Sequence, residues 1–90
     1  MNIIAIHEYN HGFIGVAIDV PSAIDFLFAH GWLDKNTEVY DGREQKWVSI
    51  IEYFGDNWQN IIRGMSAYDF NDAFLEVFEL EPLWVYEKDN

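Results

Sequence analysis

The sequence predicts an α+β fold: a mostly antiparallel sheet of four or five strands with three helices packed on it, in the order ββαββααβ. Segments rich in β-branched residues occur in pairs around turn-forming residues, which is typical of antiparallel hairpins. Elsewhere, polar residues precede apolar segments at the spacing of helix caps, and strands do not alternate with helices as in a parallel sheet. Residues 1–90 are expected to form a single domain, because ninety residues cannot enclose a second core.

The first pair of strands is predicted over Asn2–Tyr9 and Phe13–Val20. Apolar residues alternate there with small or polar ones, as in strands with one buried face. Asn10-His11-Gly12 between them supplies turn-forming residues. These residues predict a β-hairpin at the start of the chain.

A helix is predicted over Ala23–His30, after the first hairpin. Ser22 and Asp25 have the spacing of a capping box, and Gly31 follows where a helix would stop. A second hairpin is expected next. Its short β-prone strands, Thr37–Tyr40 and Gln45–Val48, flank the turn Asp41-Gly42-Arg43.

The remaining helices are predicted from three capping pairs, in which a cap residue precedes an acid or amide by three positions. Glycines at positions 55 and 64 supply stops. The pairs are Ser49 with Glu52, Asp56 with Gln59, and Ser66 with Asp69. They predict a short turn over Ile50–Phe54 and helices over Asn57–Arg63 and Ala67–Phe78, before a last edge strand over Leu83–Glu87.

The composition indicates a packed globular protein without covalent staples. Half of the residues are hydrophobic and 18% are aromatic, so a core can form. The absence of cysteine excludes disulfides, thiolate metal sites and cysteine nucleophiles. The first residues lack the features of a signal peptide, and no segment approaches the roughly 20 apolar residues of a membrane span. We therefore expect no membrane association and a cytoplasmic location, in the host cell cytoplasm if a phage encodes the protein.

The segment His7-Glu8-Tyr9-Asn10-His11 matches H-E-x-x-H, the zinc motif of many metalloproteases. That motif requires a helix, where residues four apart share one face. In a strand the two histidines would lie about 13 Å apart, so one zinc ion could not bind both. A hydrolase using His7, Glu8 and His11 remains a third hypothesis. Other catalytic motifs are missing, so we expect no enzyme activity and no cofactor.

The charge is strongly acidic and unevenly placed. Sixteen acidic residues oppose five lysines and arginines, giving a net charge of −11. This charge repels nucleic acid and attracts basic surfaces. Along the predicted last helix and the residue that follows it, acidic residues recur at intervals of 3, 4 and 3 and would form a stripe of carboxylates spaced about 4.5–6 Å along the axis. The members are Asp69, Asp72, Glu76 and Glu79, with Glu81 following.

The hairpin residues Tyr9, Asn10, Gly12, Gly15 and Asp19 form a pattern that resembles the first domain of the DNA-mimicking anti-restriction proteins of plasmids and conjugative elements. The chain is about half as long as those proteins and lacks the aromatic residue that usually follows in the second strand. In size and charge it is also similar to small acidic proteins of bacteriophages and mobile elements, including anti-CRISPR proteins that block the DNA-binding cleft of a nuclease. These resemblances imply a DNA mimic.

The leading hypothesis is a non-enzymatic inhibitor that binds a basic nucleic-acid-binding surface, such as that of a bacterial defence nuclease. Its contact residues would be Asp69, Asp72, Glu76, Glu79 and Glu81. The alternative is a phage or mobile-element interaction module with an apolar contact, carried for example by Trp58 or Trp84, and acids that only confer solubility. The partner is expected to be a protein and not nucleic acid. The oligomeric state is left open.

Overall fold

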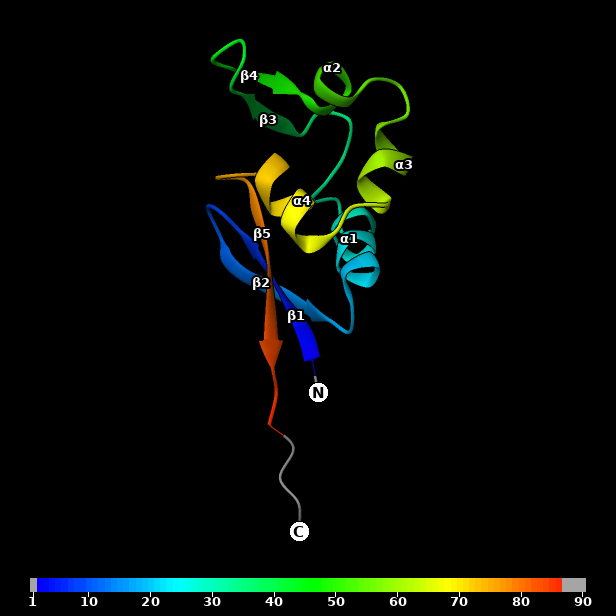
Figure 1. The fold of residues 1–90 in the computed structure, drawn as a ribbon, viewed down its shortest axis with the longest axis vertical. Coiled ribbons are helices and arrows are strands. Elements are labelled where there is room, and N and C mark those ends of the chain that lie inside the picture. Colours follow the sequence, from blue (N-terminus) through cyan, green and yellow to red (C-terminus); the bar gives the residue numbers. More distant parts are fainter. Residues whose placement is uncertain (1, 87–90) are drawn as a thin grey trace.

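The computed structural model describes residues 2–86 and has an α+β fold with antiparallel pairing. Two sheets are present among these residues, where the sequence predicted one, and four helices instead of three, because Ile50–Phe54 forms a helix of its own. Figure 1 shows the sheets toward opposite ends of the molecule. The elements are β1 Asn2–Glu8, β2 Gly12–Ala17, α1 Val20–Ala29, β3 Glu38–Asp41, β4 Lys46–Ser49, α2 Ile50–Phe54, α3 Trp58–Arg63, α4 Ala67–Ala73 and β5 Phe78–Trp84.

The larger sheet has three strands in the order β2-β1-β5, and both pairings are antiparallel. β1 and β5 pair along their whole length, from Asn2 opposite Trp84 to Glu8 opposite Phe78. Alternate side chains therefore point to opposite faces. One face carries buried Ile4 and Ile6. The two-stranded sheet pairs β3 with β4, which confirms the second predicted hairpin.

Helix α1 begins three residues earlier than predicted, because Asp19 and not Ser22 is its N-cap. The Asp19 carboxylate accepts a hydrogen bond from the backbone N–H of Ser22 at 2.8 Å. Gly31 follows the helix with φ +74°, the left-handed conformation expected of a stop. Gly15 on β2 lies close under this helix: a Cβ there would be 2.7 Å from the ring of Phe26. The glycine thus permits the close packing of α1 on β2.

The predicted helix over Ala67–Phe78 is too long, because α4 ends at Ala73. The serine cap is confirmed: Ser66 Oγ accepts a hydrogen bond from the N–H of Asp69 at 3.1 Å. At the other end the chain turns, and the N–H groups of Val77 and Phe78 both donate to the carbonyl of Phe74. The chain then leaves the helix direction and pairs with β1. Pairing of seven residues with β1 therefore overrides the local helical period.

The last strand is correspondingly displaced from its prediction. It covers Phe78–Trp84, whereas the sequence predicted Leu83–Glu87. Glu87 lies outside the described residues.

The prediction of Asp56 as a helix cap was wrong, because the N-cap of α3 is Asn57, whose side chain makes no capping hydrogen bond. By contrast, the Ser49 cap of α2 is confirmed, since Ser49 Oγ accepts from the N–H of Glu52 at 3.2 Å.

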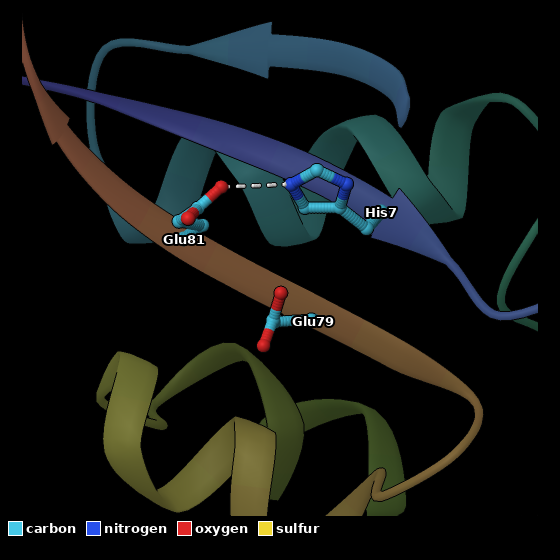
Figure 2. Close-up of side chains that lie close together, drawn as sticks. All are labelled: His7, Glu79 and Glu81. Atoms are coloured by element: carbon cyan, nitrogen blue, oxygen red, sulfur yellow. Dashed lines mark hydrogen bonds and ion pairs between the residues drawn. The ribbon is translucent and has the colours of Figure 1, made fainter. Parts of the chain in front are cut away.

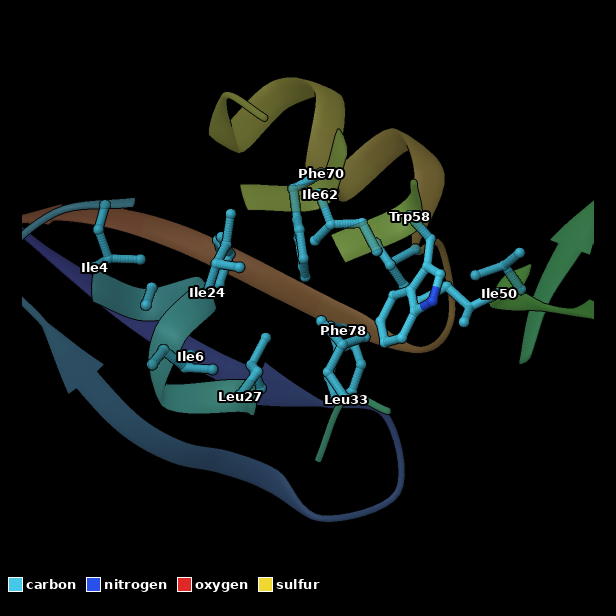
Figure 3. Packing of buried hydrophobic residues seen from close by; sticks show 14 of the residues in the cluster. Ile4, Ile6, Ile24, Leu27, Leu33, Ile50, Trp58, Ile62, Phe70 and Phe78 are labelled. Carbon is cyan, nitrogen blue, oxygen red and sulfur yellow. The ribbon is translucent and has the colours of Figure 1, made fainter. Parts of the chain in front are cut away.

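A single core joins the two sheets (Figure 3). Its centre is aromatic: Phe70 and Phe74 are fully buried and their rings stack at 4.5 Å. Ile24 and Leu27 of α1 pack on the sheet side of this centre. The core reaches the smaller sheet through Val39, Val48, Ile50 and Trp58.

No helix formed by residues 2–86 is long and apolar enough to cross a membrane.

The outer edge of β5 is partly covered by a side chain. The Asn71 amide group donates to the carbonyl of Leu80 at 2.9 Å and accepts from the N–H of Leu80 at 2.7 Å. Asn71 thus takes the place of one residue of a neighbouring strand. Unpaired strand edges favour aggregation, and this contact closes part of the edge.

Candidate acidic docking face

The face of the three-stranded sheet that points away from the core is apolar along β2 and acidic along β5. Phe13 lies opposite His7, and His7 lies opposite Glu79, so the three side chains form one row across the sheet. A second row consists of Val16, Ala5 and Glu81. Phe13 is 60% exposed and Val16 is 53% exposed. The outer residues of both rows are therefore accessible to a partner, whereas Ala5 at the centre of the second row is buried.

His7 lies at the centre of the acidic part of this face (Figure 2). Its Nε2 atom is 3.1 Å from Oε1 of Glu81, which lies diagonally opposite on β5. The imidazole ring also makes an edge contact with Phe13, with ring centroids 6.0 Å apart. The side chain of Glu79 comes from the same strand as Glu81 and lies next to this pair. Two strands distant in sequence thus assemble one cluster.

Glu8 ends β1 and organises the turn that follows. Its carboxylate accepts hydrogen bonds from the N–H groups of Asn10 at 2.8 Å and His11 at 3.0 Å, and lies 2.6 Å from Nδ1 of His11. Burial raises the pKa of the Glu8 carboxyl, but these hydrogen bonds outweigh that effect and hold the pKa below its usual value. The two histidines of the H-E-x-x-H segment therefore contact different carboxylates, His7 that of Glu81 and His11 that of Glu8.

A pocket of about 350 Å³ opens beside this cluster, at the end of β1 and β5. Four of its lining residues carry an imidazole or carboxyl group: His7, Glu8, Glu76 and Glu79. Glu76 has φ +62°, a left-handed conformation that is costly for a residue with a Cβ atom. Such strain persists only where the surrounding structure imposes it, and it is often found at functional positions.

The five predicted contact residues are all exposed, but they do not form one helical stripe. Asp69 and Asp72 lie on α4, Glu76 in the following turn, and Glu79 and Glu81 on β5. The stripe prediction was wrong because α4 ends at Ala73. Glu79 and Glu81 are exposed, whereas Phe70 of α4 and its C-cap residue Phe74 are buried in the core. The structure therefore brings Glu76 and Glu79 together around the pocket and adds Glu81 through His7.

Charge separates the molecule into two regions. The sheet end, residues 2–34 and 64–86, contains nine acidic residues and no lysine or arginine. The hairpin end, residues 35–63, contains five acidic residues and four lysines or arginines. Arg63, at the boundary, forms an ion pair with Asp25 and lies 4.3 Å from the centre of the Phe28 ring. The sheet end thus carries most of the net charge.

The two tryptophans proposed for an apolar contact differ. Trp58 is buried and 8% exposed, so it belongs to the core and cannot carry that contact. Trp84, at the end of β5, is 70% exposed. Tyr9, in the turn after β1, is 69% exposed.

Sequence reasoning missed the association of His7 with Glu79 and Glu81. The alternation Glu79-Leu80-Glu81 indicates a strand with an acidic outer face, but His7, which contacts Glu81, lies 74 residues earlier in the sequence.

No family model, curated protein or solved structure matches this chain. The geometry of the site is therefore the basis for its functional interpretation.

Proposed function

We propose that the protein is a non-enzymatic inhibitor whose sheet end binds a basic nucleic-acid-binding surface of another protein and thereby excludes nucleic acid. The observation that carries this proposal is the charge segregation, with nine acidic residues and no lysine or arginine at the sheet end. A nuclease of a bacterial defence system offers a surface of this kind. Exclusion requires only occupancy of that surface, so no catalytic residue is needed.

The acidic face is suited to association by electrostatic attraction. Glu76, Glu79 and Glu81 are exposed and lie around one end of the sheet, where lysine and arginine are absent from the adjoining described segments. Complementary charge accelerates encounter and selects among partners. Since the helical stripe does not form, the regular spacing predicted for its carboxylates does not support the proposal. The support comes from charge density over a defined face.

A second candidate contact is favoured by the apolar strip. Phe13 and Val16 are both more than half exposed and lie on β2, which β1 separates from the carboxylates of β5. In this alternative, the protein is an interaction module whose binding energy comes from the apolar strip. Charge screening would then scarcely weaken binding between 0.05 and 0.5 M salt, in round numbers, whereas the acidic contact would weaken steeply.

The proposal is tested by competition between the protein and a fluorescent DNA duplex on candidate defence nucleases. The sheet-end variant changes Glu76, Glu79 and Glu81 to lysine. The matched hairpin-end variant changes Glu38, Glu44 and Glu52 to lysine, which alters the net charge equally. We expect the first variant to displace DNA at least about tenfold less well, because exposed ion pairs contribute up to about 1 kcal/mol each. The second should stay within about threefold of the unchanged protein.

Two outcomes contradict the proposal. If excess unchanged protein displaces no DNA from any nuclease tested, it is not an inhibitor of that class. If both triple variants lose displacement equally, total charge and not the sheet end is responsible. A further variant, Asp69→Lys with Asp72→Lys, measures the contribution of α4, and Phe13→Ala measures that of the apolar strip.

A further inference from the structure

His7, Glu79 and Glu81 form a cluster with the composition of a metal site. Each offers one ligand atom, and the three atoms lie within 4.8 Å of one another. No other group of three such side chains has this proximity within residues 2–86. Figure 2 shows the imidazole of β1 facing the two carboxylate groups of β5.

We propose that these three side chains bind a divalent zinc ion. Tetrahedral zinc with ligand bonds of about 2.0–2.2 Å requires ligand atoms about 3.3 Å apart. His7 Nε2 and Glu81 Oε1 are already 3.1 Å apart. Glu79 is exposed, so rotation about its side-chain bonds can bring its oxygen the remaining distance. One nitrogen and two oxygen ligands leave a fourth position open to water.

The surroundings of the cluster favour a cation independently of these distances. Two carboxylates lie side by side on one face of β5, and the imidazole can supply at most one positive charge. Lysine and arginine are absent from residues 2–34 and 64–86, so no permanently charged basic side chain of the sheet end balances them. The His7 ring is held in edge contact with Phe13, which limits its rotation. The adjoining pocket gives an ion access from solvent.

This site differs from the one that the H-E-x-x-H segment indicates. In that motif His7 would share zinc with His11, but His11 lies in the turn between β1 and β2 and contacts Glu8. The strand pairing supplies carboxylates from β5 in its place. The inference does not depend on the proposed inhibitory function. A bound ion would neutralise two carboxylates of the docking face, so zinc should also weaken attachment to a basic partner.

The test is calorimetric titration of the full chain with zinc chloride in a non-chelating buffer near neutral pH. We expect one zinc ion per chain, and at least about tenfold weaker binding after His7→Ala or Glu79→Gln, since each removes a ligand. His11→Ala is the matched control: His11 also contacts a carboxylate, but only that of Glu8. It should bind zinc as the unchanged protein does.

Circular dichroism establishes that each variant is folded, and Glu79→Gln keeps the test valid if His7→Ala does not fold. Cobalt chloride gives a second readout, because tetrahedral cobalt with a histidine ligand absorbs strongly in the visible range. Absence of zinc binding up to about 1 mM would overturn the inference. So would equal losses in the His7 and His11 variants, or full binding by His7→Ala. None of these results depends on DNA displacement, so the two proposals fail separately.

Discussion

The sheet end and the hairpin end share one core but have different surfaces. The sheet end has nine acidic residues and no lysine or arginine, whereas the hairpin end has five and four. Exposed aromatic residues occur at both ends, for example Phe13 at the sheet end and, at the hairpin end, Tyr40 and Trp47, whose ring centroids are 5.7 Å apart. Acids needed only for solubility would be mixed with bases over the whole surface. Binding of a basic partner at the sheet end, as proposed, would account for this difference.

The sheet end and the hairpin end are held together by one cluster of buried residues. Val39 and Val48 of the smaller sheet belong to one cluster with Ile6 and Phe70 of the sheet end. Exposed residues at either end can therefore be changed without altering this core. Matched substitutions, one at each end, separate effects on the surface from effects on global stability.

The largest expected difference concerns two asparagines on helices. Asn71→Ala at the sheet end removes both hydrogen bonds to Leu80 and leaves two backbone groups at the β5 edge without this partner. We expect a loss of about 1–3 kcal/mol in the free energy of unfolding, measured by urea denaturation. Asn60→Ala at the hairpin end removes one exposed bond to Asn57 and should change stability by less than about 0.5 kcal/mol.

Because both asparagines lie on helices, replacement by alanine changes helix propensity similarly in the two variants. The contrast therefore isolates the edge contact. Hydrogen exchange at the Leu80 amide provides a local readout and should accelerate in Asn71→Ala. Equal stability losses in the two variants would show that the Asn71 contact does not hold the edge of β5.

A smaller effect is expected at two positions with left-handed backbone. Glu76 at the sheet end has φ +62°, and Gln45 at the hairpin end has φ +54°. Glycine adopts this conformation without steric cost, so Glu76→Gly and Gln45→Gly should each change the free energy of unfolding by about +1 kcal/mol or less. Thermal unfolding measures both values.

The two glycine variants should differ in function despite similar stability. Glu76 lines the pocket next to His7 and Glu79, whereas Gln45 lies in the β3–β4 turn. We expect Glu76→Gly alone to weaken DNA displacement. If neither variant is stabilised, the left-handed conformation is not strained. If both displace DNA equally well, Glu76 is not part of the docking face.

Local elements were largely predictable from the sequence, because their signals lie within a few residues. The first hairpin follows from β-prone segments around the turn before Gly12, and the Ser49 and Ser66 caps follow from their spacing to Glu52 and Asp69. The start of α1 was misplaced because Asp19 and Ser22 are both good cap residues. Only the structure shows that Asp19 accepts the capping bond.

Long-range pairing explains what could not be predicted. The segment after Ala73 has a helical period in its phenylalanines and a strand period in Glu79-Leu80-Glu81. Only pairing with β1 decides between them, and β1 lies at the opposite end of the sequence. The same pairing sets the register that puts His7 beside Glu81. The sequence therefore supplied candidate acidic residues, but not the pairing that puts two of them beside His7.

The smallest effect concerns pH, and its source again lies at the sheet end. Asp19 and Glu8 both have a pKa below the usual value, Asp19 through hydrogen bonds from the hydroxyl and N–H of Ser22. A carboxyl group whose pKa is lowered in the folded state stabilises the protein at pH values above its usual pKa, which is 4.5 for Glu8. This stabilisation is lost as the pH falls through the pKa of the folded state. Glu8→Gln should therefore be less stable than the unchanged protein at pH 7, with a difference that shrinks below about pH 4.5.

Urea denaturation of both proteins between pH 7 and pH 3, in round numbers, measures this change. His11→Ala removes the side-chain hydrogen bond to Glu8 but keeps the two backbone N–H donors. The dependence on pH that Glu8 contributes should then become weaker and remain in the same direction. A difference between Glu8→Gln and the unchanged protein that stays constant over this range would mean that the turn is held by its backbone conformation and not by the Glu8 charge.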